Sequence, residues 1–498
     1  MVVDSHLRVD GNLLGHNLVN RILDELTIYN AEKDVARRMK RWGWEELPDD
    51  FLLGSLDGDT LVMPRGYAFQ LKTLLRQKDL RTQWVDRRKW KRGEPFAKYD
   101  GNFPFKPHQS VAMRKIVRHQ QGMYEAPTGS GKTVTCLGFL NHKQPQRTII
   151  LVDKLDLLNQ WRKEIVRWLG IPMVDVGMIG GGWWKEGARV TVATVQTIRE
   201  RLPDDDWFAT WDCVILDECH HVSAETIQAI VGGFNAKYRF GVSATPDRKN
   251  DKFEFALDVL GEVFYQDDEE ELRDSGVLMR PLVRVIKTDF NHVYWNDHHS
   301  DEDHECHVPG CKLSGQRPHE HRNNYTQVKR ALIDDKARNN LVIAAIKGEV
   351  IKGNHHHLII SDEIKHLEAL EAALDRSVRL VKGMPEVFVM TGQVRGDKRV
   401  QMKEAIEEAD AAIIFATVAK EGLDIPKVDR IYLPFPASNP AKVQQWIGRG
   451  TRIAEGKTDI IVFDFFDYNV GIMRSQFRKR RFKCYDKLGM EVDLGVAA

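Results

Sequence analysis

The stretch Ala126-Pro-Thr-Gly-Ser-Gly-Lys-Thr133 is the most informative segment of this 498-residue chain. Gly129 and Gly131 let backbone N–H groups approach a polyphosphate that larger side chains would block. Lys132 would reach the β- and γ-phosphates, and the Thr133 hydroxyl would bind Mg²⁺. A helix is expected to begin here, and its N-terminus favours anions. Position 126 holds Ala where the strict pattern has Gly, so a glycine turn before a helix is the alternative interpretation.

A second motif, Val214-Ile-Leu-Asp-Glu-Cys-His220, is typical of a buried strand that ends in two carboxylates. Asp217 is suited to hold the Mg²⁺ that accompanies a polyphosphate, and Glu218 to orient and deprotonate an attacking water. Ligands of a parallel sheet bind at the carboxyl ends of its strands, so we expect both motifs at one edge of a sheet. Alone, such a strand end is usually only solvated; its place after a phosphate loop favours the functional interpretation.

Short apolar runs rich in β-branched residues alternate with helical patterns in two parts of the chain. The runs are 148–153, 190–194, 213–217 and 239–243 in the first part, and 358–361, 387–390, 412–417, 430–434 and 460–465 in the second. Near-continuous runs of this kind are typical of strands buried on both faces of a parallel sheet. The pattern predicts two related α/β domains. The predicted division is an N-terminal accessory module (1–103), a first α/β domain (104–280), a linker (281–324) and a second α/β domain (325–498).

A third motif lies in the second α/β domain. Gln445, Arg449 and Arg452 fall on a helix expected over 441–453, and spacings of four and three residues put them on one face. Fixed guanidinium groups there could neutralise charge that develops on a γ-phosphate. For this segment alone, an ordinary basic helix face is the simpler interpretation. The phosphate loop in the other α/β domain favours the functional one.

The composition restricts the classes of partner. The chain has 73 Lys and Arg against 72 Asp and Glu, a formal net charge of +1. This balance excludes a globally basic coat protein and an acidic disordered chain, so any nucleic-acid surface must be local. No apolar run approaches the roughly 20 residues of a membrane helix, and the first ten residues lack an apolar signal core. We therefore expect a soluble cytoplasmic protein with no membrane partner.

A basic stretch from Lys72 to Lys98 contains Trp84 and Trp90. Basic residues beside exposed aromatic rings suit phosphate neutralisation combined with base stacking. The alternative is a solvated linker whose tryptophans pack on the rest of the protein. The sequence does not decide between these interpretations.

Residues 290–324 are rich in histidine and have neither a helix nor a strand period. Cys306 and Cys311 have a workable spacing for one structural Zn²⁺, with His319 and His321 as further candidate ligands. The histidine pair is closer than the usual zinc spacing, and His304 and His307 are alternatives. A polar loop that is enriched in histidine by coincidence is the other interpretation.

In this order the motifs resemble those of superfamily 2 helicases. The resemblance covers about 103–490, through segments 105–109, 126–133, 152–161, 193–198, 217–220, 243–246, 358–362, 417–426 and 445–452. Within the superfamily, the Asp217-Glu-Cys-His220 box and Glu421-Gly-Leu-Asp-Ile-Pro426 are similar to the xeroderma pigmentosum group B type and the phage UvsW type of DNA helicase. Residues 57–66 resemble a small module that precedes the motor in such proteins.

The resemblance implies two tandem RecA-like parallel-sheet domains with a small N-terminal α+β module, and it implies ATP and Mg²⁺ as cofactors. The residues implied for nucleotide and metal are Gln109 (adenine), Thr128, Gly129, Ser130, Gly131, Lys132, Thr133, Asp217, Glu218, Gly422 and Asp424. The implied catalytic groups are Glu218, Asp217, Lys132 and the arginine fingers Arg449 and Arg452. The implied coupling residues are His220, Ser243, Thr245 and Gln445. Position 446 is Trp where Arg is common in the family.

The predicted function is an ATP-dependent DNA helicase or translocase. Its partner would be double-stranded or branched DNA with a single-stranded tracking strand, in replication, recombination or repair. An RNA helicase is an alternative, because motor motifs do not distinguish the two nucleic acids. The motor subunit of a restriction complex is a second alternative, although no nuclease constellation accompanies the motor. A zinc-dependent binding protein with a vestigial motor is a third, and the complete motifs argue against it. Protein partners are not indicated.

Overall fold

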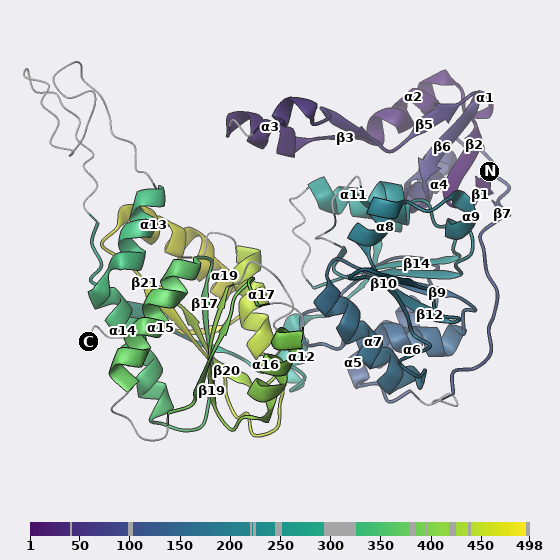
Figure 1. Ribbon diagram of the computed structural model, residues 1–498. Helices are drawn as coiled ribbons and strands as arrows, with labels where there is room; N and C mark the ends of the chain where they lie inside the picture. The colour runs from purple at the N-terminus through teal and green to yellow at the C-terminus, as the bar shows by residue number, and fades with distance from the viewer. Residues whose placement is uncertain are drawn as a thin grey trace, which may run out of the picture. The chain divides into compact units, whose positions relative to one another are not determined.

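The computed structural model describes residues 1–39, 42–97, 103–219, 222, 226–244, 251–292, 325–378, 384–394, 397–417, 425–436 and 440–494. The chain folds as two compact units, residues 1–272 and 273–498. Figure 1 shows a sheet covered by helices in each unit. Within the described ranges, no helix combines the length and the apolar content needed to cross a bilayer.

An eight-stranded sheet forms the centre of the first unit, in the order β11-β10-β12-β9-β13-β14-β8-β15. Its strands are β8 (Gln121–Glu125), β9 (Thr148–Val152), β10 (Gly177–Gly180), β11 (Trp183–Lys185), β12 (Val190–Thr194), β13 (Cys213–Leu216), β14 (Tyr238–Ser243) and β15 (Val263–Gln266). Every pairing is parallel except that of β10 with β11. All residues of β9, β12, β13 and β14 are buried, which is why these runs are apolar throughout rather than alternating.

Helices cover both faces of this sheet (Figure 1). On one face lie α5 (Pro107–Ile116), α6 (Lys132–Lys143) and α7 (Leu155–Leu169); on the other lie α8 (Val195–Arg201), α9 (Asp205–Phe208), the π-helical segment η4 (Ile227–Val231) and α11 (Asp251–Leu260). Helix α7 shows why: Leu158, Trp161, Ile165 and Leu169 recur at helical spacing and are buried.

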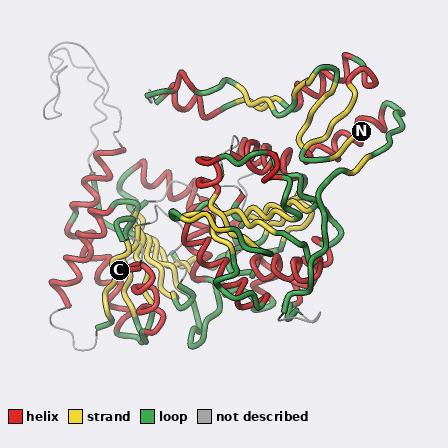
Figure 2. Tube along the Cα trace, turned by 45° about the vertical axis from the view of Figure 1, so that its right-hand side comes forward, coloured by secondary structure: helices red, strands yellow, loops and turns green. Residues whose placement is uncertain are grey.

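The N-terminal part of the first unit is a mixed α/β module, and its strands form a layer separate from the eight-stranded sheet (Figure 2). Its sheet, in the order β5-β6-β2-β1-β7, contains β1 (Val2–Val3), β2 (His6–Asp10), β5 (Ser55–Asp57), β6 (Thr60–Pro64) and β7 (Val85–Asp86), and a separate pair contains β3 (Thr27–Tyr29) and β4 (Asp50–Leu52). The helices are α1 (Gly11–Leu14), α2 (His16–Glu25), α3 (Ala31–Arg38), η1 (Trp44–Glu46), η2 (Arg65–Tyr67) and α4 (Ala68–Gln77). Phe255 of α11 lies in the core of this module, so the module packs on the larger sheet domain.

The second unit has a seven-stranded, fully parallel sheet in the order β18-β19-β17-β20-β21-β16-β22. Its strands are β16 (Leu282–Lys287), β17 (His356–Ser361), β18 (Glu386–Met390), β19 (Ala412–Thr417), β20 (Val428–Leu433), β21 (Ile461–Phe466) and β22 (Glu491–Asp493). The helices of this unit are α12 (Glu269–Asp274, which begins at the end of the first unit), α13 (Tyr325–Asp334), α14 (Lys336–Val350), α15 (Ile364–Val378), α16 (Asp397–Glu408), α17 (Pro440–Gly450), α18 (Gly471–Gln476), η5 (Phe477–Phe482) and α19 (Lys483–Lys487). Strand β16, whose residues fall in the segment expected as a linker, lies between β21 and β22 in this sheet.

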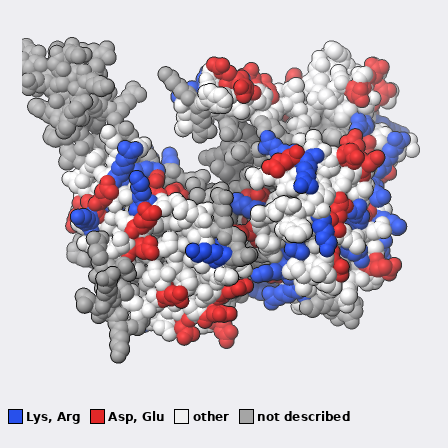
Figure 3. Space-filling model, in the orientation of Figure 1, with Lys and Arg blue, Asp and Glu red and all other residues white. Residues whose placement is uncertain are grey.

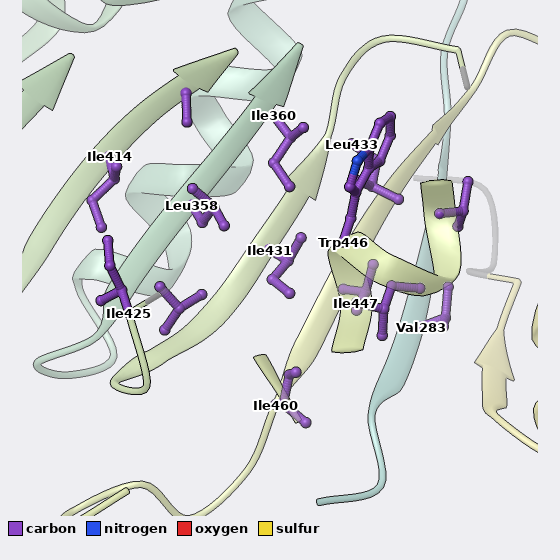
Figure 4. Close-up of a cluster of buried hydrophobic side chains, with 14 of the residues drawn as sticks. Val283, Leu358, Ile360, Ile414, Ile425, Ile431, Leu433, Trp446, Ile447 and Ile460 are labelled. Atoms are coloured by element: carbon purple, nitrogen blue, oxygen red, sulfur yellow. The ribbon is translucent and has the colours of Figure 1, made fainter. Parts of the chain in front are cut away.

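One face of the second sheet is closed by α17. Trp446 and Ile447 of this helix pack against Ile431 and Leu433 of β20, as Figure 4 shows. Trp446 is 3% exposed, so the side chain that stands where Arg is common belongs to the core. The two mainly parallel sheets confirm the predicted α/β fold class.

Candidate functional site

The loop between β8 and α6 has the geometry of an anion cradle. Gly129 and Gly131 have φ values of 90° and 91°, which L side chains rarely adopt. Gly131 is the residue before α6, and no side chain caps the first N–H groups of that helix. A Cβ atom at Gly131 would lie 2.2 Å from Nε2 of Gln109. The loop therefore depends on glycine and leaves the start of α6 open to an anionic ligand.

Side chains of helix α5 form hydrogen bonds with this loop. The Gln109 amide donates to the carbonyl oxygens of Ser130 at 3.3 Å and Gly131 at 3.4 Å, and its Oε1 accepts from the backbone of Lys106 at 2.9 Å. His108 Nε2 lies 2.8 Å from the same Ser130 oxygen. Both polar ends of Gln109 thus bond the chain itself.

Two features of the loop fit a bound phosphate. The Ser130 hydroxyl oxygen is buried and has no hydrogen-bond partner among the described residues. Buried polar atoms normally have partners, so this hydroxyl is suited to a ligand oxygen. Thr133 in the first turn of α6, together with the nearby carboxylates, supplies the hard oxygen donors that Mg²⁺ prefers.

The two carboxylates stand directly after β13. Asp217 is 7% exposed, and its carboxylate accepts from the Trp161 indole at 2.7 Å and from the Glu218 backbone at 2.9 Å. Burial and the neighbouring Glu218 raise the pKa of Asp217 to about 6. No Lys, Arg or His side chain in the described ranges forms an ion pair with Asp217. A buried carboxylate of this kind is stabilised by a cation that arrives from outside.

Glu218 and Lys132 come together across the sheet edge. Lys132 Nζ lies 3.5 Å from Oε1 of Glu218, although the two residues are 86 positions apart. Glu218 has a φ of 47°, a left-handed conformation that costs energy for a residue with a Cβ atom. Ser243, the first residue of the helicase-like segment 243–246, ends β14, and its carbonyl accepts from the backbone N–H of Ala126 at 2.9 Å. The residues expected at one edge of the sheet therefore meet there.

In the second unit, Arg452 follows α17, and two backbone interactions fix its position. It forms a β-bridge with Leu278, and its carbonyl accepts from Lys457 Nζ at 3.0 Å. Gln445 and Arg449 lie on α17, but their side chains are outside the described part of the structure. Eight further predicted site residues also lie outside the described residues: His220, Thr245, Gly422, Asp424, Cys306, Cys311, His319 and His321. Among the described residues, no group of three or more potential metal-ligating side chains is present.

The sequence did not indicate two residues of the site. Trp161 lies in the helicase-like segment 152–161, but its helical spacing predicts only a core side chain, and no sequence pattern indicates the hydrogen bond from its indole to Asp217. His108 has no motif of its own beside Gln109. Both act through contacts that join separate elements, which a local pattern does not encode.

Comparisons with known proteins identify helicase family models and relatives. Residues 102–248 match the family model "Type III restriction enzyme, res subunit", and residues 339–454 match "Helicase conserved C-terminal domain". The "DNA 3'-5' translocase XPB2" of Sulfurisphaera tokodaii is 29% identical over 179 residues, which cover 36% of this chain and 39% of that protein. The "ATP-dependent DNA helicase uvsW" of phage T4 is 23% identical over 384 residues, which cover 74% of this chain and 70% of that protein.

A solved fragment of an HsdR subunit of a type I restriction enzyme from Vibrio vulnificus has the same fold. Its TM-score is 0.53 at 17% identity, over 78% of this chain and 66% of that one. This likeness confirms the tandem RecA-like architecture. The chain spans less than half the length of the archaeal translocase.

Proposed function

Because the chain belongs to the superfamily 2 helicases, we propose that it is an ATP-driven motor that translocates along or unwinds DNA. The observation that carries the proposal is the meeting of Lys132, Asp217 and Glu218 at the carboxyl edge of the first sheet. The arrangement places a cation, a metal-binding carboxylate and a candidate base beside an open helix N-terminus. Those are the parts that phosphoryl transfer to water requires.

We propose the following roles at this edge. The N–H groups of the loop over 128–131 and the Ser130 hydroxyl bind phosphate oxygens, and Lys132 neutralises the β- and γ-phosphates. Thr133 and Asp217 hold Mg²⁺, which when bound polarises the phosphate and spreads its charge. Glu218 orients the attacking water and accepts its proton.

The remaining assignments rest on the family and are also part of the proposal. Gln109 would read adenine, and Gly422 and Asp424 would contact the nucleotide. Arg449 and Arg452 would stabilise charge on the γ-phosphate during hydrolysis. Binding and hydrolysis of ATP would be coupled to the contacts with DNA through His220, Ser243, Thr245 and Gln445. Because fingers act on transition-state charge, Arg452→Ala is expected to lower kcat far more than ATP affinity.

A zinc ion in the segment over 306–321 is the last element of the proposal. If Cys306 and Cys311 hold Zn²⁺ with two of the nearby histidines, the variant with both cysteines changed to Ser loses about one zinc per chain. Metal analysis of protein purified without added zinc measures this. A zinc content near zero, equal in both proteins, would show a polar insertion instead.

The decisive test is the steady-state ATPase rate with no nucleic acid, duplex DNA, forked DNA, and RNA. The proposal expects the largest stimulation by DNA, and loss of all activity in Lys132→Ala. Lys163→Ala is the matched control, because Lys163 is an exposed lysine on α7 outside the site. Stimulation by RNA alone would favour the RNA helicase alternative. Absence of ATP hydrolysis would refute the motor.

A further inference from the structure

A cavity of about 480 Å³ lies in the first unit, well away from the phosphate loop. Its walls come from η2 and α4 of the N-terminal module, from residues 118–121 at the start of β8, and from residues 261–264 at the start of β15. The phosphate loop follows the carboxyl end of β8 at Glu125. The cavity is therefore at the amino edge of the sheet, opposite the nucleotide site, and its size is that of a ligand site.

The cavity carries an excess of positive charge. Lys72 and Arg118 line it from exposed positions, and Arg65 lines it from beneath. Arg65 donates to three neutral acceptors, the carbonyls of Ala236 and Lys237 and the Gln121 side chain, and it forms no direct ion pair with a carboxylate in the described ranges. Glu262 is the acidic residue of the lining.

Arg88 also lines the cavity, but it adds little to this field. Its guanidinium contacts both oxygens of Asp86 at 2.7 Å. On the face shown in Figure 3, basic and acidic side chains are interspersed. A chain with a net charge of +1 needs a local excess of positive charge to bind an anionic polymer. The cavity provides such an excess.

Aromatic rings accompany these cations. Phe69 on α4 is 61% exposed. Trp84 also lines the cavity, and Lys72 Nζ lies 4.8 Å from its ring centroid. On the opposite wall, His119 stacks on Phe264 with centroids 5.0 Å apart and an angle of 17°. Exposed rings beside cations are the surface on which unpaired bases stack.

The two tryptophans of the basic stretch have different environments. Trp90 packs edge-on against Tyr238 at 4.9 Å and belongs to the periphery of the core. Trp84 also packs, partly buried, at the periphery of a core, that of the N-terminal module, and it lines the cavity as well. The packing interpretation therefore applies to both rings, and Trp84 is the one of the two that also lines the cavity.

The cavity walls are fixed relative to each other. Arg65 ties the module to the carbonyls of Ala236 and Lys237, and the buried Arg239 ties β14 to the Ser5 carbonyl at 3.1 Å. A Cβ atom on Gly66 would lie 2.2 Å from the carbonyl oxygens of Leu257 and Asp258, so η2 and α11 touch backbone to backbone. A preformed cavity orders few side chains on binding, which favours affinity.

We propose that this cavity binds a single-stranded segment of nucleic acid, with an unpaired base stacked on Phe69 or Trp84 and neighbouring phosphates bound by Lys72 and Arg118. The identity of the partner class rests on the proposed function. The cavity itself is distinct from the nucleotide site, because it lies at the other edge of the sheet. It would hold a displaced strand beside the motor.

The test uses the full chain and measures the affinity for a fluorescent single strand, its abasic counterpart and a blunt duplex as a function of salt. Lys72→Ala with Arg118→Ala is expected to weaken single-strand binding and to reduce the salt slope by about 1 to 2. The control removes two neighbouring exposed charges outside the lining, Arg76→Ala with Lys115→Ala, and should change neither quantity.

Stacking is tested separately. Phe69→Ala is expected to weaken binding of the base-containing strand about tenfold and to spare the abasic strand, whereas Phe69→Tyr keeps a ring and restores affinity. Quenching of 2-aminopurine fluorescence in the strand should follow the same order. Equal losses for both strands, or variants that bind as the control does, would overturn the proposal. Absence of DNA-stimulated ATPase in the unmodified protein would instead refute the motor function, so the two failures are distinguishable.

Discussion

Asp217 in the first unit and Asp467 in the second occupy equivalent places but have different partners. Each is the first residue after a buried parallel strand, β13 or β21, and each is itself buried. Asp467 accepts two bonds from Arg338, at 2.6 and 3.1 Å, and one from the Thr288 hydroxyl at 2.5 Å. Asp217 accepts from an indole and a backbone N–H, which are neutral donors.

This difference in partners indicates that Asp467 stabilises the fold through an ion pair, whereas Asp217 is suited to bind a cationic ligand. The Arg338 guanidinium neutralises Asp467 inside the protein, and the second unit repeats this solution in the pair Arg481–Asp464. Asp217 lacks such a partner among the described residues, and its pKa is raised to about 6. A buried carboxylate without an ion-pair partner costs stability, so a cation that binds there would stabilise the fold.

The largest expected effect is on catalysis at the first unit. Glu218→Gln keeps the size of the side chain but removes the base, so turnover should fall by about 10²- to 10⁴-fold while ATP still binds. Single-turnover hydrolysis and nucleotide binding measure the two quantities. The unmodified rate in this variant would show that the carboxylates after β13 are no more functional than those of the second unit.

The next effect is on stability and should have opposite outcomes at the two aspartates. Asp467→Asn leaves the buried Arg338 without its counter-charge, and should lower the free energy of unfolding by about 3–5 kcal/mol. Asp217→Asn removes a buried charge that no direct ion pair among the described residues neutralises, so without Mg²⁺ it should leave stability unchanged or raise it. Denaturant unfolding of both variants measures this. Equal destabilisation would mean that Asp217 is also a structural residue.

Much of the candidate nucleotide site could be predicted from the sequence, because its parts are local patterns. The glycines of the phosphate loop and the carboxylates after β13 follow from backbone freedom and strand polarity, and parallel pairing brings them together. The Arg338–Asp467 pair joins residues 129 positions apart, and no local pattern marks it. The cavity at the amino edge has the same origin, since Arg65 and Arg118 meet only after the module docks. The position of β16 in the second sheet also depends on long-range pairing.

A third, smaller effect concerns the support of Asp217. Trp161→Phe keeps the buried ring volume nearly constant but removes the 2.7 Å bond to the carboxylate. Loss of such a supporting contact typically weakens metal binding about 10- to 100-fold, so the Mg²⁺ concentration for half-maximal ATPase should rise by that factor. Trp168→Phe is the control, because its indole bonds Glu164 on the same helix, away from the site. An equal Mg²⁺ dependence in both variants would remove Trp161 from the site.

The smallest expected effect is the pH dependence of the stability difference between the unmodified protein and Asp217→Asn. The pKa of Asp217 is raised to about 6 in the fold, from an ordinary value of 3.8, so the folded state binds a proton more tightly than the unfolded state. Without Mg²⁺, the stability of the unmodified protein relative to Asp217→Asn should therefore fall as pH rises from about 4 to 6, and stay constant above that. Burial lowers the pKa values of His357 and His366 to about 3, which acts in the opposite direction, but both proteins contain these histidines and their contribution cancels. Thermal unfolding at a series of pH values gives the difference. Added Mg²⁺ should abolish the fall in relative stability, because it binds the ionised carboxylate. A stability difference that does not change with pH, or that grows as pH rises, would show that the charge of Asp217 is already compensated within the protein, as that of Asp467 is.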